Sequence, residues 1–244
     1  MLDPIKFFTW NRSEKLKRWE QHGTSSNGLL TILSYWTGLF RHLGDFIYPL
    51  KSLIEVIEFR VWLDKRFGKI SIYRHKHALL DEVIRKASQK EHVTYYEFGV
   101  AFGETASYLT RNTTIPFVYH GYDTFEGLPK AWRRLPIGAI SAHGMSPAIF
   151  GDNINFHTGL IANTIMSTDF NSVGIKCVLF DFDLYEPTLF AYKHIKDQLN
   201  PGDIVYFDEA FDSEERIIIE NYFLEDFRFI VLGASVFGLA FQLV

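Results

Sequence analysis

The chain has 244 residues, the size of one globular domain with at most an appended element. Its 16% aromatic content excludes disorder, and its net charge of -4 argues against general nucleic-acid binding. Residues 1–70 hold 11 Lys+Arg and 7 Asp+Glu, so a mildly basic front precedes an acidic body. Cys177 is the only cysteine, which excludes a disulfide framework and favours a reducing, cytoplasmic location.

The first 75 residues are predicted to form helices. Apolar residues recur at spacings of three and four in two stripes, one over Leu29–Phe40 and one over Leu50–Trp62. We interpret residues 1–76 as a helical region that packs on the main domain or mediates a homo-oligomer. The same region is a candidate lid. The uncharged run 25–40 is too short and too polar to cross a bilayer.

From residue 77 the pattern changes to strands alternating with helices. After a helix near 77–89, we expect strands at Val93–Phe98, Phe117–Tyr122, Asn153–His157, Cys177–Phe182, Ile204–Phe207, Phe227–Leu232 and Val236–Leu243. Helices are expected near 104–111, 161–168, 188–199 and 214–224, and a long irregular loop over 124–151. This alternation predicts an α/β, doubly wound parallel sheet in residues 77–244. The last two strands are separated by three residues, so they should form an antiparallel hairpin.

The first predicted strand ends in a glycine turn. Gly99 and Gly103 have the spacing Gly-x-x-x-Gly, which differs from the glycine patterns of dinucleotide and phosphate loops. An NAD(P)-dependent oxidoreductase is therefore disfavoured. Glu97 and Glu104 flank the turn, and the turn contains no lysine. An acidic turn suits a positively charged ligand, such as the sulfonium and amino groups of S-adenosylmethionine.

The second strand leads to Asp123, which lies 20 positions after Gly103. In doubly wound sheets an acidic residue at about this separation binds ribose hydroxyls, and ligands lie at the carboxyl ends of the strands. We therefore predict that Asp123 binds ribose, with Thr124 and Phe125 beside it. Phe125, Trp132 and Trp36 could stack on adenine or on a sugar face.

Four carboxylates follow the next two predicted strands: Asp181, Asp183, Asp208 and Glu209. Because neighbouring parallel strands end at the same edge, these side chains should converge beside the ligand. Oxygen ligands suit Mg²⁺, Ca²⁺ or Mn²⁺, so the four residues are candidate metal ligands. The alternative is that some cap helices, as Asp183 could do. Asp181 and Asp183 are also candidate catalytic residues.

The histidines form no metal-ligand spacing. His143 lies in the long loop and is a candidate general base, while a surface position is the ordinary alternative. His157 ends the third predicted strand and could contact the adenosine.

Four runs of residues resemble class I S-adenosylmethionine-dependent methyltransferases, specifically the macrocin O-methyltransferase-like group. They are Tyr96–Thr105, Tyr122–Pro129, Asp181–Thr188 and Pro201–Glu209. The resemblance implies a Rossmann-like, seven-stranded sheet with an antiparallel final strand. It implies that Glu97, Gly99 and Gly103 line the methionine part of the cofactor and that Asp123 holds the ribose. The antibiotic-sugar enzymes of this group look to have an Asp-Asp pair at the position of Asp208-Glu209. This chain therefore departs from the group's pattern at one of the candidate metal ligands, Glu209.

These observations predict a methyltransferase that uses S-adenosylmethionine to methylate a hydroxyl of a small molecule, such as a sugar or glycosylated natural product. Two mechanisms stay open: Mg²⁺ could bind a diol and favour its alkoxide, or an aspartate or His143 could take the proton. The loop 124–151 and the N-terminal helices would form the lid and substrate wall. The alternative function is a catalytically silent regulatory protein that binds S-adenosylmethionine.

Overall fold

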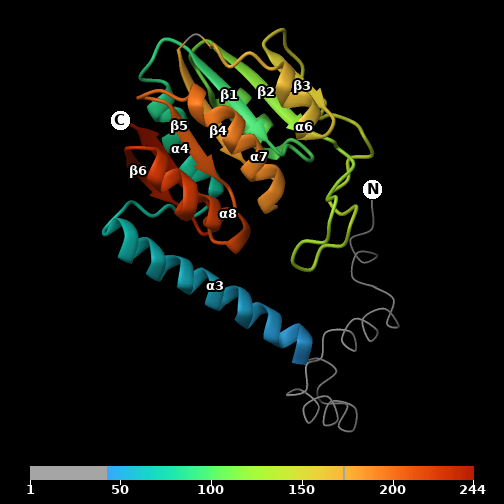
Figure 1. Ribbon diagram of the computed structural model, residues 1–244, viewed down its shortest axis with the longest axis vertical. Coiled ribbons are helices and arrows are strands. Elements are labelled where there is room, and N and C mark those ends of the chain that lie inside the picture. Colours follow the sequence, from blue (N-terminus) through green and yellow to red (C-terminus); the bar gives the residue numbers. More distant parts are fainter. Residues whose placement is uncertain (1–42, 173) are drawn as a thin grey trace. The chain divides into compact units, whose positions relative to one another are not determined.

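The computed structural model of the protein describes residues 43–172 and 174–244 (Figure 1). The predicted helical stripe over Leu29–Phe40 and Trp36 lie outside the described residues. The chain divides into two compact units, Met1–Ile54 and Glu55–Val244. This division falls within helix α3 (Leu43–Phe67), whereas the boundary expected from the sequence lies at residue 76. That boundary and the predicted homo-oligomer stay predictions.

The second unit is built on one seven-stranded sheet in the order β3-β2-β1-β4-β5-β7-β6. Its strands are β1 Val93–Phe98, β2 Phe117–Asp123, β3 Ile154–Thr158, β4 Ile175–Phe180, β5 Ile204–Phe207, β6 Phe229–Ala234 and β7 Leu239–Leu243. Strands β1 to β5 pair in parallel, and β7 lies antiparallel between β5 and β6. The predicted seven-stranded sheet and its antiparallel hairpin are therefore confirmed.

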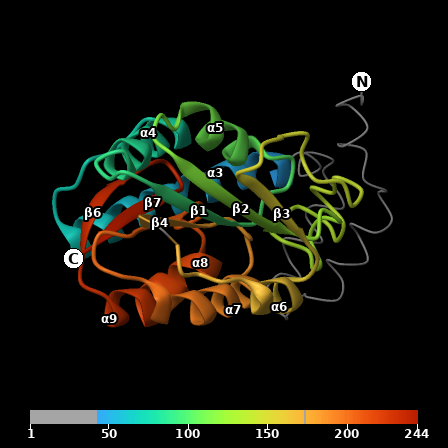
Figure 2. The ribbon, with the colours of Figure 1, turned by 90° about the horizontal axis from the view of Figure 1, so that it is seen from above.

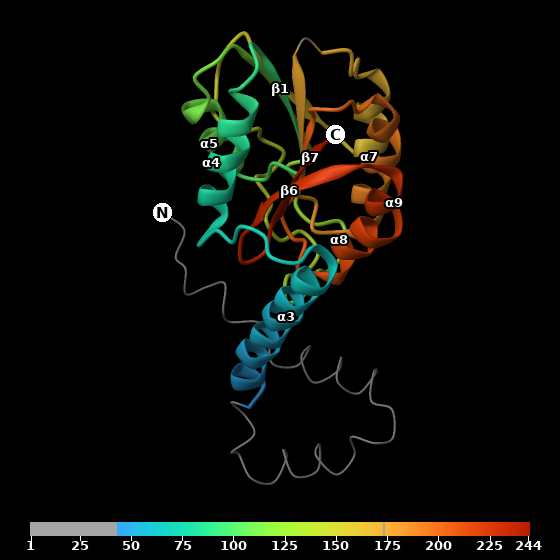
Figure 3. The same ribbon diagram turned by 90° about the vertical axis from the view of Figure 1, so that its left-hand side faces the viewer.

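Helices cover both faces of this sheet (Figure 2). One face carries α4 (Lys76–Ala87) and α5 (Glu104–Asn112). The other carries α6 (Ile161–Thr164), α7 (Tyr185–Ile195), α8 (Ser213–Ile218) and α9 (Leu224–Asp226), as the edge view also shows for most of them (Figure 3). Short helical turns η3 (Ile165–Ser167), η4 (Lys196–Gln198) and the π-helical η5 (Ile219–Phe223) complete this layer. Every residue of β1, β4 and β5 is consequently buried.

The core has two large apolar clusters, one on each face of the sheet, and a small third cluster of Leu128, Ala139 and Leu184. Aromatic rings dominate the cluster beneath α7 to α9, where Phe207, Phe223 and Phe241 pack with centroids 4.7–6.4 Å apart. Phe59 and Leu63 of α3 are fully buried in the same cluster. Packing of this extent makes the sheet a rigid support for the loops that leave its carboxyl edge.

Helix α3 confirms that the stripe over Leu50–Trp62 is helical, but most of that stripe is not buried. Leu50, Leu53, Ile54, Ile57 and Val61 are 45–55% exposed. Phe59 and Leu63, spaced by four residues, are instead the buried pair, because they share the helix face that enters the core. Ile57 and Val61 therefore do not pack on the main domain, and the alternative, that they pack on a second subunit, stays a prediction.

Two element boundaries differ from the sequence prediction at the carboxyl end of β4. The strand ends at Phe180, so Asp181 and Phe182 lie in the following loop. Helix α7 begins at Tyr185, three residues earlier than expected, because Pro187 is compatible with the first helical turn. Within the described residues, the structure contains no helix with the length and hydropathy needed to span a bilayer.

Candidate active site

The turn between β1 and α5 is held by Asp123 at the end of β2. Oδ2 of Asp123 accepts hydrogen bonds from the backbone N–H groups of Val100 and Ala101, both at 2.8 Å. Oδ1 accepts a third from the N–H of Phe125 at 2.7 Å. A carboxylate has about four acceptor positions. One acceptor position therefore remains for a ligand. The sequence predicted that Asp123 binds ribose hydroxyls, and a pair of hydroxyls would need two positions.

The two glycines of this turn are required by the packing of the chain itself. Gly99 has a φ of +96°, and a Cβ at this position would overlap the backbone carbonyl of Asp181. Gly103 has a φ of +78°, and a Cβ there would overlap the ring of Pro147 in the loop 124–151. Gly99 also lines a pocket, whereas Gly103 is not among the described residues that line it. The absent side chain at Gly99 thus lets β1 approach the β4 loop, before any ligand is considered.

The pocket lies at the carboxyl ends of β1, β2 and β4. Its walls come from the β1 turn, the loop 124–151, the start of α6 and the loop after β4. The polar side chains facing it are Asp123, Thr124, Asp181 and Asp183. None of the described lining residues is Lys, Arg or His. The pocket is therefore acidic and otherwise apolar, with Leu128, Ile140, Phe182 and other carbon-rich side chains in its walls.

Asp183 lines the pocket from the loop between β4 and α7. Its backbone has a φ of +62°, a strained conformation for a residue other than glycine. It does not cap α7, since Leu184 occupies the cap position and the Tyr185 N–H is bonded to Glu214. Burial first, and the negative charge of Asp208 second, raise the pKa of Asp183 to about 7. Such a carboxyl can accept a proton near neutral pH.

Asp181 and Asp208 share the side chain of Lys76. The Lys76 Nζ lies 3.2 Å from Oδ2 of Asp181 and 2.9 Å from Oδ2 of Asp208. Oδ1 of Asp208 accepts a 2.6 Å hydrogen bond from the hydroxyl of Tyr206. Burial lowers the pKa of Lys76, but Asp181 and Asp208 outweigh it and raise that pKa. The lysine is therefore charged, and it neutralises part of the carboxylate cluster.

The four carboxylates predicted to bind a metal do not form a metal site. No group of three or more His, Cys, Asp or Glu side chains suited to a metal occurs in the part of the chain that the structure describes. The Lys76 ammonium pairs with both Asp181 and Asp208 and so occupies the position between them. Burial and the charge of Asp208 raise the pKa of Glu209, whose backbone N–H donates to buried Glu215. The residues present therefore do not fit a divalent cation.

Glu97 is buried inside the sheet layer and is not among the described pocket-lining residues. It is 1% exposed, and its Oε2 accepts a 2.7 Å hydrogen bond from the hydroxyl of Tyr119. Burial raises the pKa of Glu97 to about 8, although Tyr119 and Lys76 act in the opposite direction. Glu97 therefore contributes a mostly neutral carboxyl beneath the turn, and the predicted contact with the cofactor stays a prediction.

Three further predicted site residues lie away from the pocket walls that the structure describes. His143 is exposed in a left-handed backbone conformation, and its N–H is bonded to Ser141. His157 stacks on Tyr122 at 4.4 Å between centroids. Phe125 is fully buried against Phe156. None of the three is among the described residues that line the pocket.

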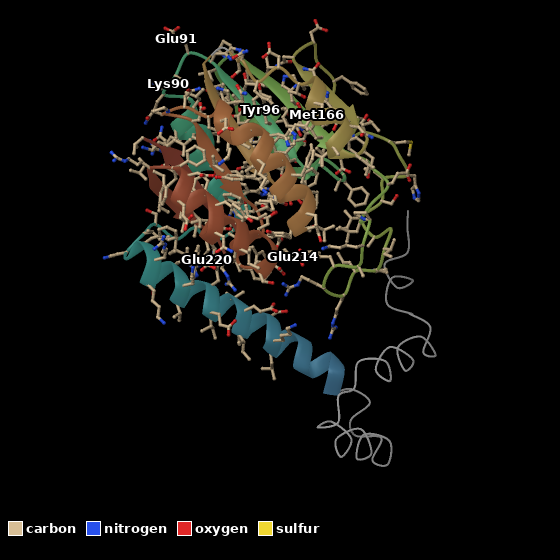
Figure 4. All side chains as sticks on the ribbon, in the orientation of Figure 1. Lys90, Glu91, Tyr96, Met166, Glu214 and Glu220 are labelled. Atoms are coloured by element: carbon tan, nitrogen blue, oxygen red, sulfur yellow. The ribbon has the colours of Figure 1, made fainter. Side chains whose placement is uncertain are left out.

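The loop 124–151 forms ion pairs with acidic residues at the N-termini of α7 and α8. Lys130 pairs with Glu186 at 2.7 Å and with Glu214 at 3.6 Å. Figure 4 labels Glu214. Arg133 pairs with Asp212 at 2.7 Å and with Glu55 of α3. Because the loop also supplies pocket residues from Thr124 to Ile140, these ion pairs hold one wall of the site in place.

Sequence reasoning missed Lys76, Tyr206 and Arg133. Lys76 is 105 residues from Asp181 and 132 from Asp208, and no motif surrounds it. Its only sequence signal is a position next to the start of a predicted helix. The contact could be found only once the sheet order was known, because that order brings α4 to the carboxyl ends of β4 and β5.

No protein-family model matches the chain, and no curated protein matches it. Among solved structures, it is similar to the calicheamicin methyltransferase CalS11, with 17% identity over 99% of this chain and 94% of that one, at a TM-score of 0.51. It is also similar to the O-methyltransferase NovP, with 14% identity over 69% of this chain and 80% of that one, at a TM-score of 0.50. These likenesses show that the chain has the Rossmann-like fold of class I methyltransferases.

Proposed function

We propose that this chain is an S-adenosylmethionine-dependent O-methyltransferase that acts on a small hydroxylated molecule. The observation that carries the proposal is the acidic pocket at the carboxyl ends of β1, β2 and β4. Its described walls contain three carboxylates and no basic side chain, so it favours a ligand with sulfonium and ammonium charges over a dinucleotide pyrophosphate.

Residues of the pocket divide between the parts of this ligand. Asp123 has one acceptor position left after its three backbone bonds, and it would accept from a ribose hydroxyl. Leu128 and Ile140 from the loop 124–151 would contact the adenine by apolar packing. Asp181 and Asp183 lie on the β4 side, and the amino and sulfonium groups would lie nearer to them.

The cofactor supplies an electrophilic methyl group, and the chain must align the acceptor hydroxyl with it and take the hydroxyl proton. Asp183 is the residue assigned to that proton, because it lines the pocket and its pKa is raised to about 7. The acceptor oxygen forms a bond to the methyl carbon as the carbon–sulfur bond breaks. The products are the methyl ether, S-adenosylhomocysteine and a protonated Asp183. No step is assigned to a divalent metal.

The loop wall and the structural relatives support the proposed acceptor class. CalS11 is a calicheamicin methyltransferase and NovP is an O-methyltransferase, so both fit hydroxyl-containing natural products or sugars as acceptors for this chain. The fastened loop 124–151 supplies a fixed wall against which a ring-shaped acceptor could lie.

The proposal is tested with S-adenosylmethionine carrying a labelled methyl group and a panel of deoxysugar, glycoside and catechol acceptors. We expect label to appear in one acceptor class with the wild type. Asp183→Asn should retain cofactor binding, measured by calorimetry, and lose most of the transfer. Cofactor binding without transfer to any acceptor class would favour the silent regulatory protein, and absence of cofactor binding would contradict both functions.

A further inference from the structure

The ammonium of Lys76 is built into the acidic edge of the sheet by the start of α4. His75 caps this helix, its Nδ1 accepting from the N–H of Ala78 at 3.2 Å, which fixes Lys76 as the first helical residue. From there the side chain reaches Asp181 and Asp208, which follow two neighbouring strands. The lysine side chain is 28% exposed, so the contact is partly shielded from water.

We propose that Lys76 is the resident cation of this carboxylate cluster, in place of a divalent metal, and that methyl transfer by this chain requires no added metal. The inference rests on the proposed function for its catalytic part. Its cation-binding part concerns the protein alone and can be measured without cofactor or acceptor.

The positions of individual oxygens support this assignment. Oδ2 of Asp181 and Oδ2 of Asp208 both face the Lys76 Nζ, so a metal shared by these carboxylates would compete with the ammonium for them. The other oxygen of Asp208 is already engaged by the Tyr206 hydroxyl. A divalent cation would therefore have to displace the ammonium and then share the site with its positive charge. Coulomb repulsion between two cations at such a distance opposes that exchange.

Asp181 connects this cation to the pocket. Asp181 lines the pocket, whereas Lys76 is not among the described lining residues, so Lys76 is a positioning residue that acts through Asp181. The ammonium holds the Asp181 carboxylate in place and offsets its charge beside the acceptor. Without it, Asp181 and Asp208 would repel each other and would attract another cation.

The test compares Lys76→Met, Lys76→Arg and the matched control Lys196→Met in thermal melts with chelator, Mg²⁺ or Mn²⁺. Lys196 also pairs with an aspartate, Asp226, at 2.9 Å, but on the outer surface of the helical layer. For the wild type, Lys76→Arg and Lys196→Met, we expect the melting temperature of each protein to be the same with chelator as with cation. Lys76→Met should gain stability with Mg²⁺ or Mn²⁺, by roughly 5–10 °C at a hundredfold excess over Kd.

Electron paramagnetic resonance of Mn²⁺ with the protein alone gives a second readout, and it remains usable with the wild type if Lys76→Met does not fold. The proposal is overturned if the wild type binds one Mn²⁺ that is lost in Asp208→Asn, or if folded Lys76→Met shows no cation response. It is also overturned if chelator abolishes methyl transfer. Absence of transfer with the expected cation results would instead contradict the proposed function alone.

Discussion

Replacing Asp123 with alanine removes the acceptor that holds the β1–α5 turn. Two of its bonds, to the N–H groups of Val100 and Ala101, connect positions 23 and 22 residues apart. Each bond to a charged group contributes about 1.5 kcal/mol at the lower end of the usual range, so their loss should cost about 3 kcal/mol. The third bond, to the Phe125 N–H, is local and adds less. The melting temperature should therefore fall by roughly 6–12 °C.

Chemical and thermal unfolding of Asp123→Ala, Asp123→Asn and wild type measure this cost. Asparagine keeps one carbonyl acceptor, so its stability should lie between the other two. Asp169→Ala is the matched control, because Asp169 accepts one backbone N–H at 2.9 Å on the exposed surface. S-adenosylmethionine affinity of Asp123→Ala should also fall roughly ten- to hundredfold, the loss of one charge-assisted bond. If Asp123→Ala melted at the same temperature as the wild type, the reasoning would be refuted.

Three further predictions concern the glycine turn and two carboxyls. Gly99→Ala should lose cooperative unfolding, because its Cβ would overlap the Asp181 carbonyl. The control Gly138→Ala has a φ of +77° and open space around the added Cβ, so its free energy of unfolding in urea should fall by only about 1–2 kcal/mol. The Glu97 pKa of about 8 lies above its unfolded value, so wild-type stability should fall as pH rises from about 5 to 8. Glu97→Gln should show a smaller fall, because Asp183 and Glu209 also have raised pKa values and still contribute. Equal falls in parallel pH melts of both proteins would contradict the prediction. The methyl-transfer rate should rise with pH through about 7, and a wild-type profile flat from about pH 5 to 9 would remove Asp183 as the base.

The strands were predictable because their burial leaves a direct trace in the sequence. Val93–Phe98 and Ile204–Phe207 are apolar runs bounded by turn residues, and the structure places β1 and β5 at those residues. The hairpin was predictable because the expected connection of three residues is too short to cross over a sheet, and the connection found, residues 235–238, is as well. The end of β4 was predicted two residues too late, because Phe182 continues the apolar run beyond the last strand residue, Phe180.

The candidate site was only partly predictable, because sequence shows which residues leave a strand end but not what they meet. Asp181 and Asp183 were predicted at the ligand site from their strand positions, and Asp123 from its strand position and its separation from Gly103. All three line the pocket. The metal prediction could not anticipate Lys76, which reaches Asp208 from 132 residues away. Glu97 was predicted as a ligand residue, but the alternation of a strand turns its side chain toward Tyr119.

Calorimetric titration of the wild type with S-adenosylmethionine, and separately with NAD⁺, tests the central claim most directly. The acidic pocket predicts that S-adenosylmethionine binds at one site per chain and that NAD⁺ at the same concentration gives no binding heat. A melt of the same samples should show stabilisation by S-adenosylmethionine alone. Binding of NAD⁺ with no binding of S-adenosylmethionine would contradict the account.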